Sequence, residues 1–153
     1  GLKWPNDLLW QGRKIAGLLL EVKGEFAGPS RIIAGVGVNT RIDAAHGQGI
    51  DQPWVDLQHI PGGARISRHQ LVGRLLDHLV GEFQRFGREG FPPLVELWRC
   101  HDAYLGQRVR LSRGEHLVEG IDRGVNESGA LLLECGGELR TFIGGELSLR
   151  NSP

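Results

Sequence analysis

The sequence predicts an α+β chain, in which a mixed sheet with packed helices is followed by a small β-barrel of the SH3 type. Three observations support this prediction. The first forty residues contain apolar strand-like runs, residues 67–101 show helical spacing of apolar residues, and five short strand-like runs follow residue 104. We therefore place a domain boundary near Tyr104, with a first domain over residues 1–103 and a second over residues 104–153.

Four strands are expected in the first domain. They are Leu2–Trp4, Leu8–Trp10, Lys14–Lys23 and Arg31–Asn39. Pro5 ends the first strand because proline cannot donate to a ladder. The second and third strands form a hairpin around the turn Gln11-Gly12-Arg13. The third and fourth strands carry apolar residues at both odd and even positions, so we expect both of their faces to be covered.

Two helices are expected after a loop over residues 40–65, which is long enough to suggest a functional role. Ser67 caps a first helix that runs to about Arg88. A second helix spans roughly Pro93 to His101. The apolar residues of the first helix recur at helical spacing, and we expect them, together with Trp98, to lie in the core. These residues are Leu71, Leu75, Leu79, Phe83 and Phe86.

The second domain is expected to contain five short strands separated by glycine-containing turns. They are Val109–Leu111, His116–Ile121, Ala130–Glu134, Glu138–Phe142 and Leu147–Leu149. Five short strands within about fifty residues are typical of a small barrel of the SH3 type.

The amino-acid composition argues against a nucleic-acid-binding protein, a membrane protein and a metal-binding protein. Lys+Arg and Asp+Glu are balanced at 18 each, which provides no basic face for nucleic acid. No apolar run is long enough for a membrane span, and no signal peptide opens the chain, so we expect a cytoplasmic protein. Cys100, Cys135 and the six histidines show no metal-binding spacing, so we expect no metal site. The absence of methionine, and an opening that has the pattern of a strand interior, predict that sequence is missing upstream.

Three segments combine polar or cationic residues with strand ends. They are K-W-P-N-D at residues 3–7, R-K-I-A-G at residues 13–17 and G-V-G-V-N at residues 35–39. Glycines in a buried strand indicate that something approaches the backbone closely, and a flat ligand is one candidate. Lys3 and Lys14 would face that ligand, whose phosphate or carboxylate offsets their desolvation. Taken singly, each lysine can instead be an ordinary strand-end lysine, and Asn6-Asp7 can be a simple turn.

The three segments, in this order and spacing, resemble the core of biotin protein ligases. G-A-L-L-L-E at Gly129–Glu134 and F-I-G-G-E-L-S-L-R at Phe142–Arg150 resemble the C-terminal domain of that family. The resemblance covers nearly the whole chain. It implies a class II synthetase-like ligase core, truncated at its N-terminus, followed by an SH3-like domain. The family's Gly- and Arg-rich biotin loop precedes the K-W-P-N-D segment and is not found here, so we expect the chain alone to be inactive or nearly so.

The resemblance implies a two-step reaction that uses biotin, ATP and Mg²⁺. Biotin is activated to biotinyl-5′-AMP and then transferred to a lysine of the biotin carboxyl carrier protein of acetyl-CoA carboxylase. By similarity, Lys14 is the central cation, and Lys3 and Arg13 are weaker candidates. Asp7 is a candidate for orienting or deprotonating the incoming lysine.

Further binding residues are also implied by the resemblance. Asn6 borders the reacting centre, Asn39 hydrogen-bonds the nucleotide, and Gly17, Gly35 and Gly37 lie beside the ligand. The loop after Asn39 covers the adenylate, and Trp54 either stacks on the adenine or anchors the loop. Glu146 and Arg150 either face the active site or form a surface ion pair. A homodimer through an edge strand near Gly17–Lys23 is also possible.

Two other functions remain open at this point. The chain can be a non-catalytic docking or corepressor module, which would not bind adenylate. It can also be a lipoate–protein ligase, a structural cousin that performs the same adenylation. The K-W-P-N-D pattern together with the short C-terminal barrel favours biotin over lipoate.

Overall fold

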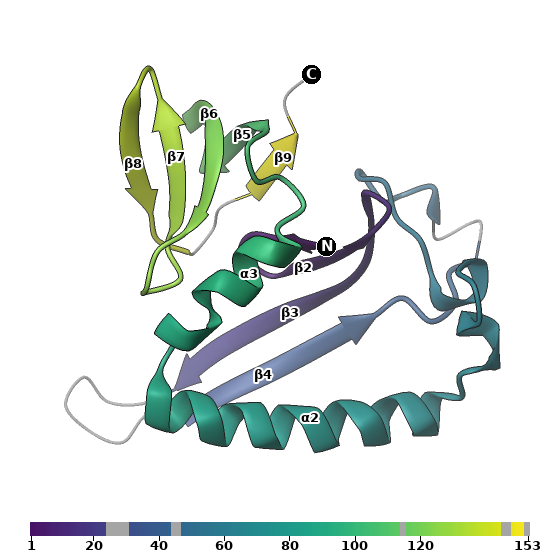
Figure 1. Cartoon of the computed structure of the whole chain (residues 1–153). Helices are drawn as coiled ribbons and strands as arrows, with labels where there is room; N and C mark the ends of the chain where they lie inside the picture. Colours follow the sequence, from purple (N-terminus) through teal and green to yellow (C-terminus); the bar gives the residue numbers. More distant parts are fainter. Residues whose placement is uncertain (24–30, 44–46, 114–115, 145–147, 152–153) are drawn as a thin grey trace. The chain divides into compact units, whose positions relative to one another are not determined.

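The computed structural model describes residues 1–23, 31–43, 47–113, 116–144 and 148–151. The chain divides into two compact units, one formed by Asn6–Ile66 and the other by Gly1–Pro5 together with Ser67–Pro153. Figure 1 shows strands and helices in the α+β composition that the sequence predicts.

The unit Asn6–Ile66 contains an antiparallel meander of three strands, β2 (Asp7–Trp10), β3 (Arg13–Lys23) and β4 (Arg31–Val38). Gln11 and Gly12 connect β2 to β3 with φ angles of 48° and 75°. Two consecutive positive φ angles are typical of the turn whose twist matches a two-residue hairpin. The predicted hairpin is therefore confirmed. Two short 3₁₀ turns follow, η1 (Leu57–His59) and η2 (Gly63–Arg65).

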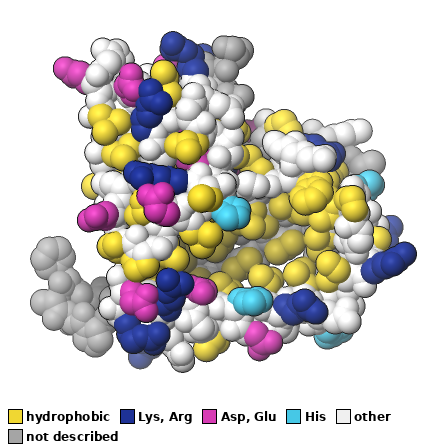
Figure 2. Space-filling model, viewed as in Figure 1, with side chains coloured by type: hydrophobic (Ala, Val, Ile, Leu, Met, Phe, Trp, Pro, Cys, Tyr) yellow, Lys and Arg dark blue, Asp and Glu magenta, His cyan; other side chains and the backbone are white. Residues whose placement is uncertain are grey.

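The prediction that the third and fourth strands are covered on both faces is wrong for their outer halves. Leu19, Leu20 and Val22 on β3 are 61–70% exposed, and Ile32 and Ile33 on β4 are 64% and 48% exposed. The described elements of this unit are three strands and two 3₁₀ turns, which provide no second apolar layer. Figure 2 shows hydrophobic side chains open on the molecular surface.

The other unit begins with β1 (Leu2–Lys3), where Leu2 forms a parallel bridge with Asp102. Its long helix, α2 (Arg68–Glu89), starts at a capping box in which Ser67 and Gln70 satisfy each other's backbone N–H groups. The turn η3 (Pro92–Leu94) leads into the short helix α3 (Val95–His101). Both helices therefore confirm the prediction.

The apolar stripe of α2 is less buried than predicted. No residue of α2 is buried, and Phe83 and Phe86 are 53% and 49% exposed. The predicted core role of this stripe is therefore wrong in this structure, because few described residues pack against α2. Trp98, in contrast, packs against the core of this unit.

A five-stranded antiparallel sheet completes this unit (Figure 1). Its strands are β5 (Arg108–Arg113), β6 (His116–Val125), β7 (Leu131–Cys135), β8 (Glu138–Phe142) and β9 (Ser148–Asn151). They lie in the order β8-β7-β6-β5-β9, so that β8 and β9 form the edges of the described ladders. The five predicted strands are confirmed, whereas the described ladders show no closed barrel.

Apolar residues of this sheet form the core of the unit together with Trp4. Val109, Leu111, Leu131, Leu133 and Leu149 are at most 1% exposed. The Trp4 indole N–H donates to the Gly129 carbonyl at 3.1 Å, which satisfies its polar atom inside an apolar site.

This packing predicts the cost of a cavity. Leu131→Ala should lower the free energy of unfolding by about 2–5 kcal/mol, because the removed side chain is fully buried and close-packed. Leu139→Ala on the neighbouring strand is the matched control, since Leu139 is 60% exposed, and it should cost less than about 1 kcal/mol. Urea unfolding measures both values, and equal losses would contradict the described core.

Candidate functional site

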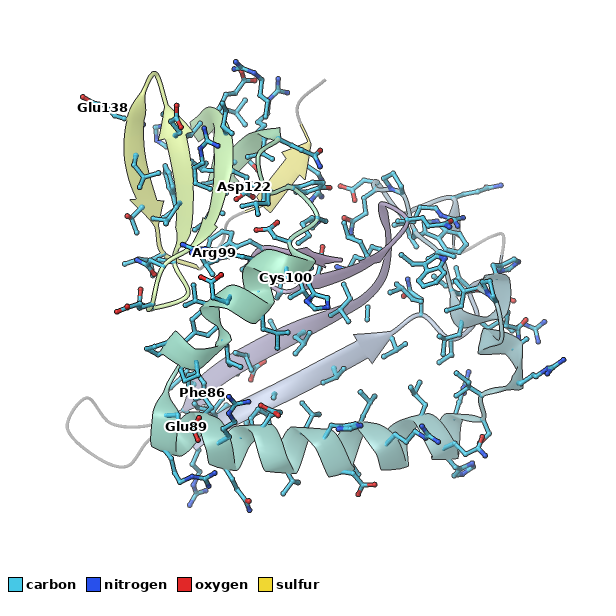
Figure 3. The ribbon with its side chains drawn as sticks, viewed as in Figure 1. Phe86, Glu89, Arg99, Cys100, Asp122 and Glu138 are labelled. Carbon is cyan, nitrogen blue, oxygen red and sulfur yellow. The ribbon has the colours of Figure 1, made fainter. Side chains whose placement is uncertain are left out.

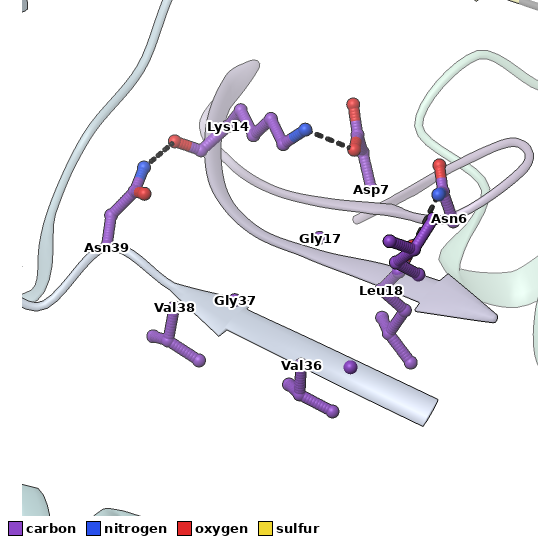
Figure 4. A pocket seen from close by; sticks show the side chains of 11 residues that line it. Asn6, Asp7, Lys14, Gly17, Leu18, Val36, Gly37, Val38 and Asn39 are labelled. Carbon is purple, nitrogen blue, oxygen red and sulfur yellow. Dashed lines mark hydrogen bonds and ion pairs between the residues drawn. The ribbon is translucent and has the colours of Figure 1, made fainter. Parts of the chain in front are cut away.

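The three strands of the unit Asn6–Ile66 line an open pocket of about 640 Å³ (Figure 4). Seven of its lining residues are polar residues or glycines of the three predicted segments. The complete lining is Asn6, Asp7, Lys14, Gly17, Leu18, Leu19, Gly35, Val36, Gly37, Val38 and Asn39. The fold therefore brings together seven residues that the sequence singled out.

An ion pair between Lys14 and Asp7 lies at one end of this pocket. Lys14 Nζ is 2.6 Å from Asp7 Oδ1, and the two side chains point toward each other in Figure 4. The side chain of Asp7 is only 8% exposed, and that of Lys14 is 30% exposed. Since a buried carboxylate requires a partner, Lys14 compensates the charge of Asp7.

An irregularity in the β2–β3 ladder places these two side chains on one face. The register shifts between Leu8 and Leu9, so that Leu9 faces Lys14 instead of Ile15. Directly opposed residues point to the same face of a sheet, and Asp7 shares the face of Leu9 because the two are two positions apart. The bulge therefore turns Lys14 toward Asp7. In a continuous ladder the lysine would point to the opposite face.

Gly17 lies opposite Asp7 in the same ladder. A Cβ atom at this position would be 3.2 Å from both Asp7 Oδ1 and Lys14 Nζ. The ion pair therefore occupies the space above the Gly17 backbone. Gly35 and Gly37 are less crowded, with no atom nearer than 3.7 Å to such a Cβ, and they leave the backbone of β4 open as a flat floor.

Asn39 holds the main chain of Lys14. Its Nδ2 donates to the carbonyls of Lys14 and Val55, both at 3.1 Å. Because both partners are acceptors, the orientation of the amide is determined, and Oδ1 is the atom that could accept a hydrogen bond from a ligand. The backbone of Lys14 is also bonded to the loop, since its N–H donates to Pro53 and its carbonyl accepts from Val55.

The side-chain amide of Asn6 also makes a hydrogen bond within the sheet, because it donates to the Leu18 carbonyl.

Four apolar lining residues were not predicted as site residues. They are Leu18, Leu19, Val36 and Val38. Their alternation with Gly17, Gly35 and Gly37 is the sequence signal that could have identified them.

Asp56 is a further residue that the sequence did not reveal. Its side chain is fully buried and accepts hydrogen bonds from the backbone N–H groups of Ile42, at 2.8 Å, and His59, at 3.2 Å. The ring nitrogen Nδ1 of His59 lies 2.5 Å from Asp56 Oδ1. Burial alone raises the pKa of Asp56, but the hydrogen bonds from Ile42 and His59 outweigh it and hold the pKa below its ordinary value. Asp56 thereby ties the start of the loop to η1.

The remaining predicted residues do not line the pocket. Arg13 lies on β3 next to the turn, and Trp54 is half-buried in the loop, where its indole N–H donates to the Gly47 carbonyl at 3.3 Å. Lys3 is buried in the other unit, and Arg150 lies on β9 of that unit, where it donates to the Leu149 carbonyl. Glu146 lies outside the described residues.

No helix among the described residues is long and apolar enough to cross a membrane. In the same part of the chain, no group of three or more His, Cys, Asp or Glu residues could hold a metal ion.

Comparison with known proteins identifies relatives of this chain. The family described as "Biotin protein ligase C terminal domain" matches residues 104–150. The bifunctional ligase/repressor BirA of Escherichia coli is 35% identical over 151 residues, which are 99% of this chain and 46% of that protein. A biotin–[acetyl-CoA-carboxylase] ligase of Mycobacterium tuberculosis is 32% identical over 96% of this chain and 52% of that protein. The chain thus spans about half the length of these curated relatives.

Solved structures agree with these matches. The biotin protein ligase of Aquifex aeolicus in complex with biotin and ATP superposes with a TM-score of 0.80 and 27% identity, over 99% of this chain and 62% of that one. A crystal structure of the same ligase superposes with a TM-score of 0.82, over 99% of this chain and 64% of that one. The resemblance noted from the motifs is confirmed: residues 104–150 match the C-terminal domain of biotin protein ligases, and ligases of that family are similar to nearly the whole of this chain.

Proposed function

We propose that the protein carrying this chain is a biotin–[acetyl-CoA-carboxylase] ligase. It forms biotinyl-5′-AMP from biotin and ATP, and it transfers biotin to a lysine of a biotin carboxyl carrier protein. The observation that carries the proposal is the Lys14 amine, which lies in a pocket of a size suited to a nucleotide and beside a flat glycine floor. The relative from Aquifex aeolicus with bound biotin and ATP supports this assignment.

In the first step, a carboxylate oxygen of biotin attacks the α-phosphorus of ATP, and pyrophosphate leaves. The step brings two anions together, so it requires positive charge that is in place beforehand. Lys14 is suited to this role because Asp7 orients its side chain and Asn39 and the loop hold its main chain. Little reorganisation is then needed when the anions arrive.

In the second step, the amine of the carrier lysine attacks the biotinyl carbonyl carbon, and AMP leaves. The amine must lose a proton, because a lysine in water titrates near pKa 10.4 and only the neutral form attacks. Asp7 is the carboxylate beside the reacting centre that can orient this amine or accept its proton. Asn6 borders the same end of the pocket, and the Asn39 oxygen is suited to accept from an N–H group of the nucleotide base.

Mg²⁺ is proposed to accompany ATP, where it would screen the phosphate charge. The pocket supplies one carboxylate, that of Asp7, which is already paired with Lys14. The described residues therefore do not form a metal cage of their own, and the ion would be held mainly by the phosphates and water.

Several finer assignments belong to the same proposal. They include a class II synthetase-like core over residues 1–103, a closed SH3-like barrel over residues 104–153, and roles at the site for Lys3, Arg13, Trp54, Glu146 and Arg150. A homodimer or carrier contact at β3 is supported by the described ladders, in which Leu19–Lys23 pair with β4 alone. An open strand edge of this kind can accept another strand.

Substitution of Lys14 tests its proposed role as the preplaced cation. The substitution is made in the natural protein that carries this chain. There, Lys14→Ala should slow biotin-dependent ATP–pyrophosphate exchange about 100-fold or more, because it removes the preplaced cation. Lys23→Ala, an exposed lysine at the far end of the same strand, is the matched control and should leave the rate unchanged. Comparable rates in the two variants would remove Lys14 from the mechanism.

Mass spectrometry of an acceptor domain after incubation with ATP and either biotin or lipoate tests the substrate class. Biotinyl-lysine is expected, whereas a lipoyl adduct would assign the protein to lipoate ligation. Calorimetric titration with ATP addresses the docking alternative, since a module without catalysis should show no binding.

Substitution of Gly17 tests whether the Lys14–Asp7 pair depends on the space above this glycine. Gly17→Ala should loosen the Lys14–Asp7 pair, because the added methyl group would press against both partners at 3.2 Å. The Lys14 amine should then react several-fold faster with an acylating reagent, as measured by peptide mass spectrometry. Gly35→Ala is the control, since its methyl group would meet no atom within 3.7 Å. If both variants leave the reactivity of Lys14 unchanged, the pair does not depend on the space above Gly17.

A further inference from the structure

Asp56 is a fully buried carboxylate that lies in the same unit as the pocket but does not line it. Its simplest role is to cap η1, since Oδ1 accepts from the His59 N–H at 3.2 Å. Capping uses one oxygen, however, and does not require burial. The other oxygen, Oδ2, accepts at 2.8 Å from the N–H of Ile42, a residue 14 positions earlier in the chain. Asp56 therefore joins two segments, residues 39–42 and residues 53–57.

These two segments also hold the main chain of Lys14. From the first segment, Asn39 Nδ2 donates to the Lys14 carbonyl at 3.1 Å (Figure 4). From the second segment, the Val55 N–H donates to the same carbonyl at 2.9 Å, and the Pro53 carbonyl accepts from the Lys14 N–H at 2.8 Å. Both polar groups of the Lys14 main chain are thus bonded to the segments that Asp56 joins.

The two segments are bonded to each other as well. Asn39 Nδ2 donates to the Val55 carbonyl at 3.1 Å, and the Leu57 N–H donates to the Asn39 carbonyl at 2.8 Å. The bond from Ile42 to Asp56 adds a third link, whose acceptor is a carboxylate shielded from water. A hydrogen bond to an ionised group is roughly twice as strong as one between neutral groups, so this third link contributes most to holding the segments together.

We propose that Asp56 is a positioning residue for the ligase reaction and that it acts through Lys14. It fixes the segments that hold the Lys14 main chain, and thereby fixes the point from which the Lys14 side chain enters the pocket. The inference rests on the proposed function, in which Lys14 is the preplaced cation. A displacement of about 1 Å at a catalytic group can cost about 100-fold in rate, so the anchor of Lys14 has a kinetic consequence.

The charge state of Asp56 agrees with this role. Burial alone would raise its pKa, but the hydrogen bonds from Ile42 and His59 hold the pKa below its ordinary value. The side chain is therefore ionised at neutral pH and can only accept hydrogen bonds. Asparagine has nearly the same size but must direct an NH₂ group at one of these donors, so Asp56→Asn disturbs the link with little change in volume.

A double-mutant cycle in the natural protein that carries this chain tests the positioning role. Asp56→Asn should slow biotin-dependent ATP–pyrophosphate exchange about 10-fold or more. In the Lys14→Ala background, the same substitution should change the residual rate by less than about twofold, because the side chain that Asp56 positions is already absent. An equal fold-loss in both backgrounds would show that Asp56 supports the fold alone, and would overturn the proposal.

Asp77→Asn on α2 is the matched control, since Asp77 is exposed and lies in the other unit. It should leave the exchange rate unchanged in both backgrounds. The cycle also separates two kinds of failure. A wild type without pyrophosphate exchange would overturn the proposed function and the positioning role with it, whereas an active wild type with equal losses would overturn the positioning role alone.

Amide hydrogen exchange tests the anchor without biotin or ATP, and in the wild type it needs no variant. The N–H groups of Ile42, Lys14 and Val55 should open with equal constants, because all three are bonded through the joined segments. In Asp56→Asn, exchange at Lys14 should be about 10-fold faster or more, as expected for loss of a charge-assisted hydrogen bond. The N–H of Asp122, on β6 of the other unit (Figure 3), is the reference and should not change. Independent opening of Lys14 and Ile42 in the wild type would contradict the anchor.

Discussion

The candidate site depends on the ion pair between Lys14 and Asp7, and that pair depends on one extra residue in the β2–β3 ladder. The register shift between Leu8 and Leu9 moves Lys14 onto the face that carries Asp7. Gly17 completes the arrangement because it has no side chain of its own, so the ion pair can occupy the space above its backbone. A cation is thus held over a flat floor before any ligand arrives, which is the arrangement that makes electrostatic catalysis effective.

The loop after β4 is a structural part of this site. Asn39, Pro53 and Val55 all bond to the backbone of Lys14, and Asp56 joins Ile42 to η1 at the base of the loop. A buried carboxylate with several hydrogen bonds is rigid, and loss of one partner would leave a costly unpaired charge. The position of Lys14 is therefore determined by residues as distant in the sequence as Val55.

Two buried carboxyl sites behave differently in this chain for a clear physical reason. Asp56 accepts from several donors, including a histidine ring, so its ionised form is favoured. Asp122 accepts one hydrogen bond from a backbone N–H, that of Gly124, and burial raises its pKa to about 7. The same residue type is thus more acidic than usual in one unit and less acidic than usual in the other, according to the donors around it.

Local interactions made much of this chain predictable from its sequence. The hairpin at Gln11-Gly12, the helix start at Ser67 and the five C-terminal strands follow from turn chemistry, capping and apolar periodicity, which act between neighbouring residues. The K-W-P-N-D, R-K-I-A-G and G-V-G-V-N segments likewise indicated most of the polar lining of the pocket. Their chemical types and strand-end positions were sufficient for that inference.

Tertiary structure alone decided the features that arise between distant residues. The bulge that turns Lys14, the burial of Asp56 and Asp122, and the exposure of Leu19 and Ile32 have no local signature. Apolar periodicity indicates that a side chain is suited to burial, whereas actual burial depends on which other elements pack against it. For the same reason, the sequence could name a set of charged residues but could not show which of them share a face.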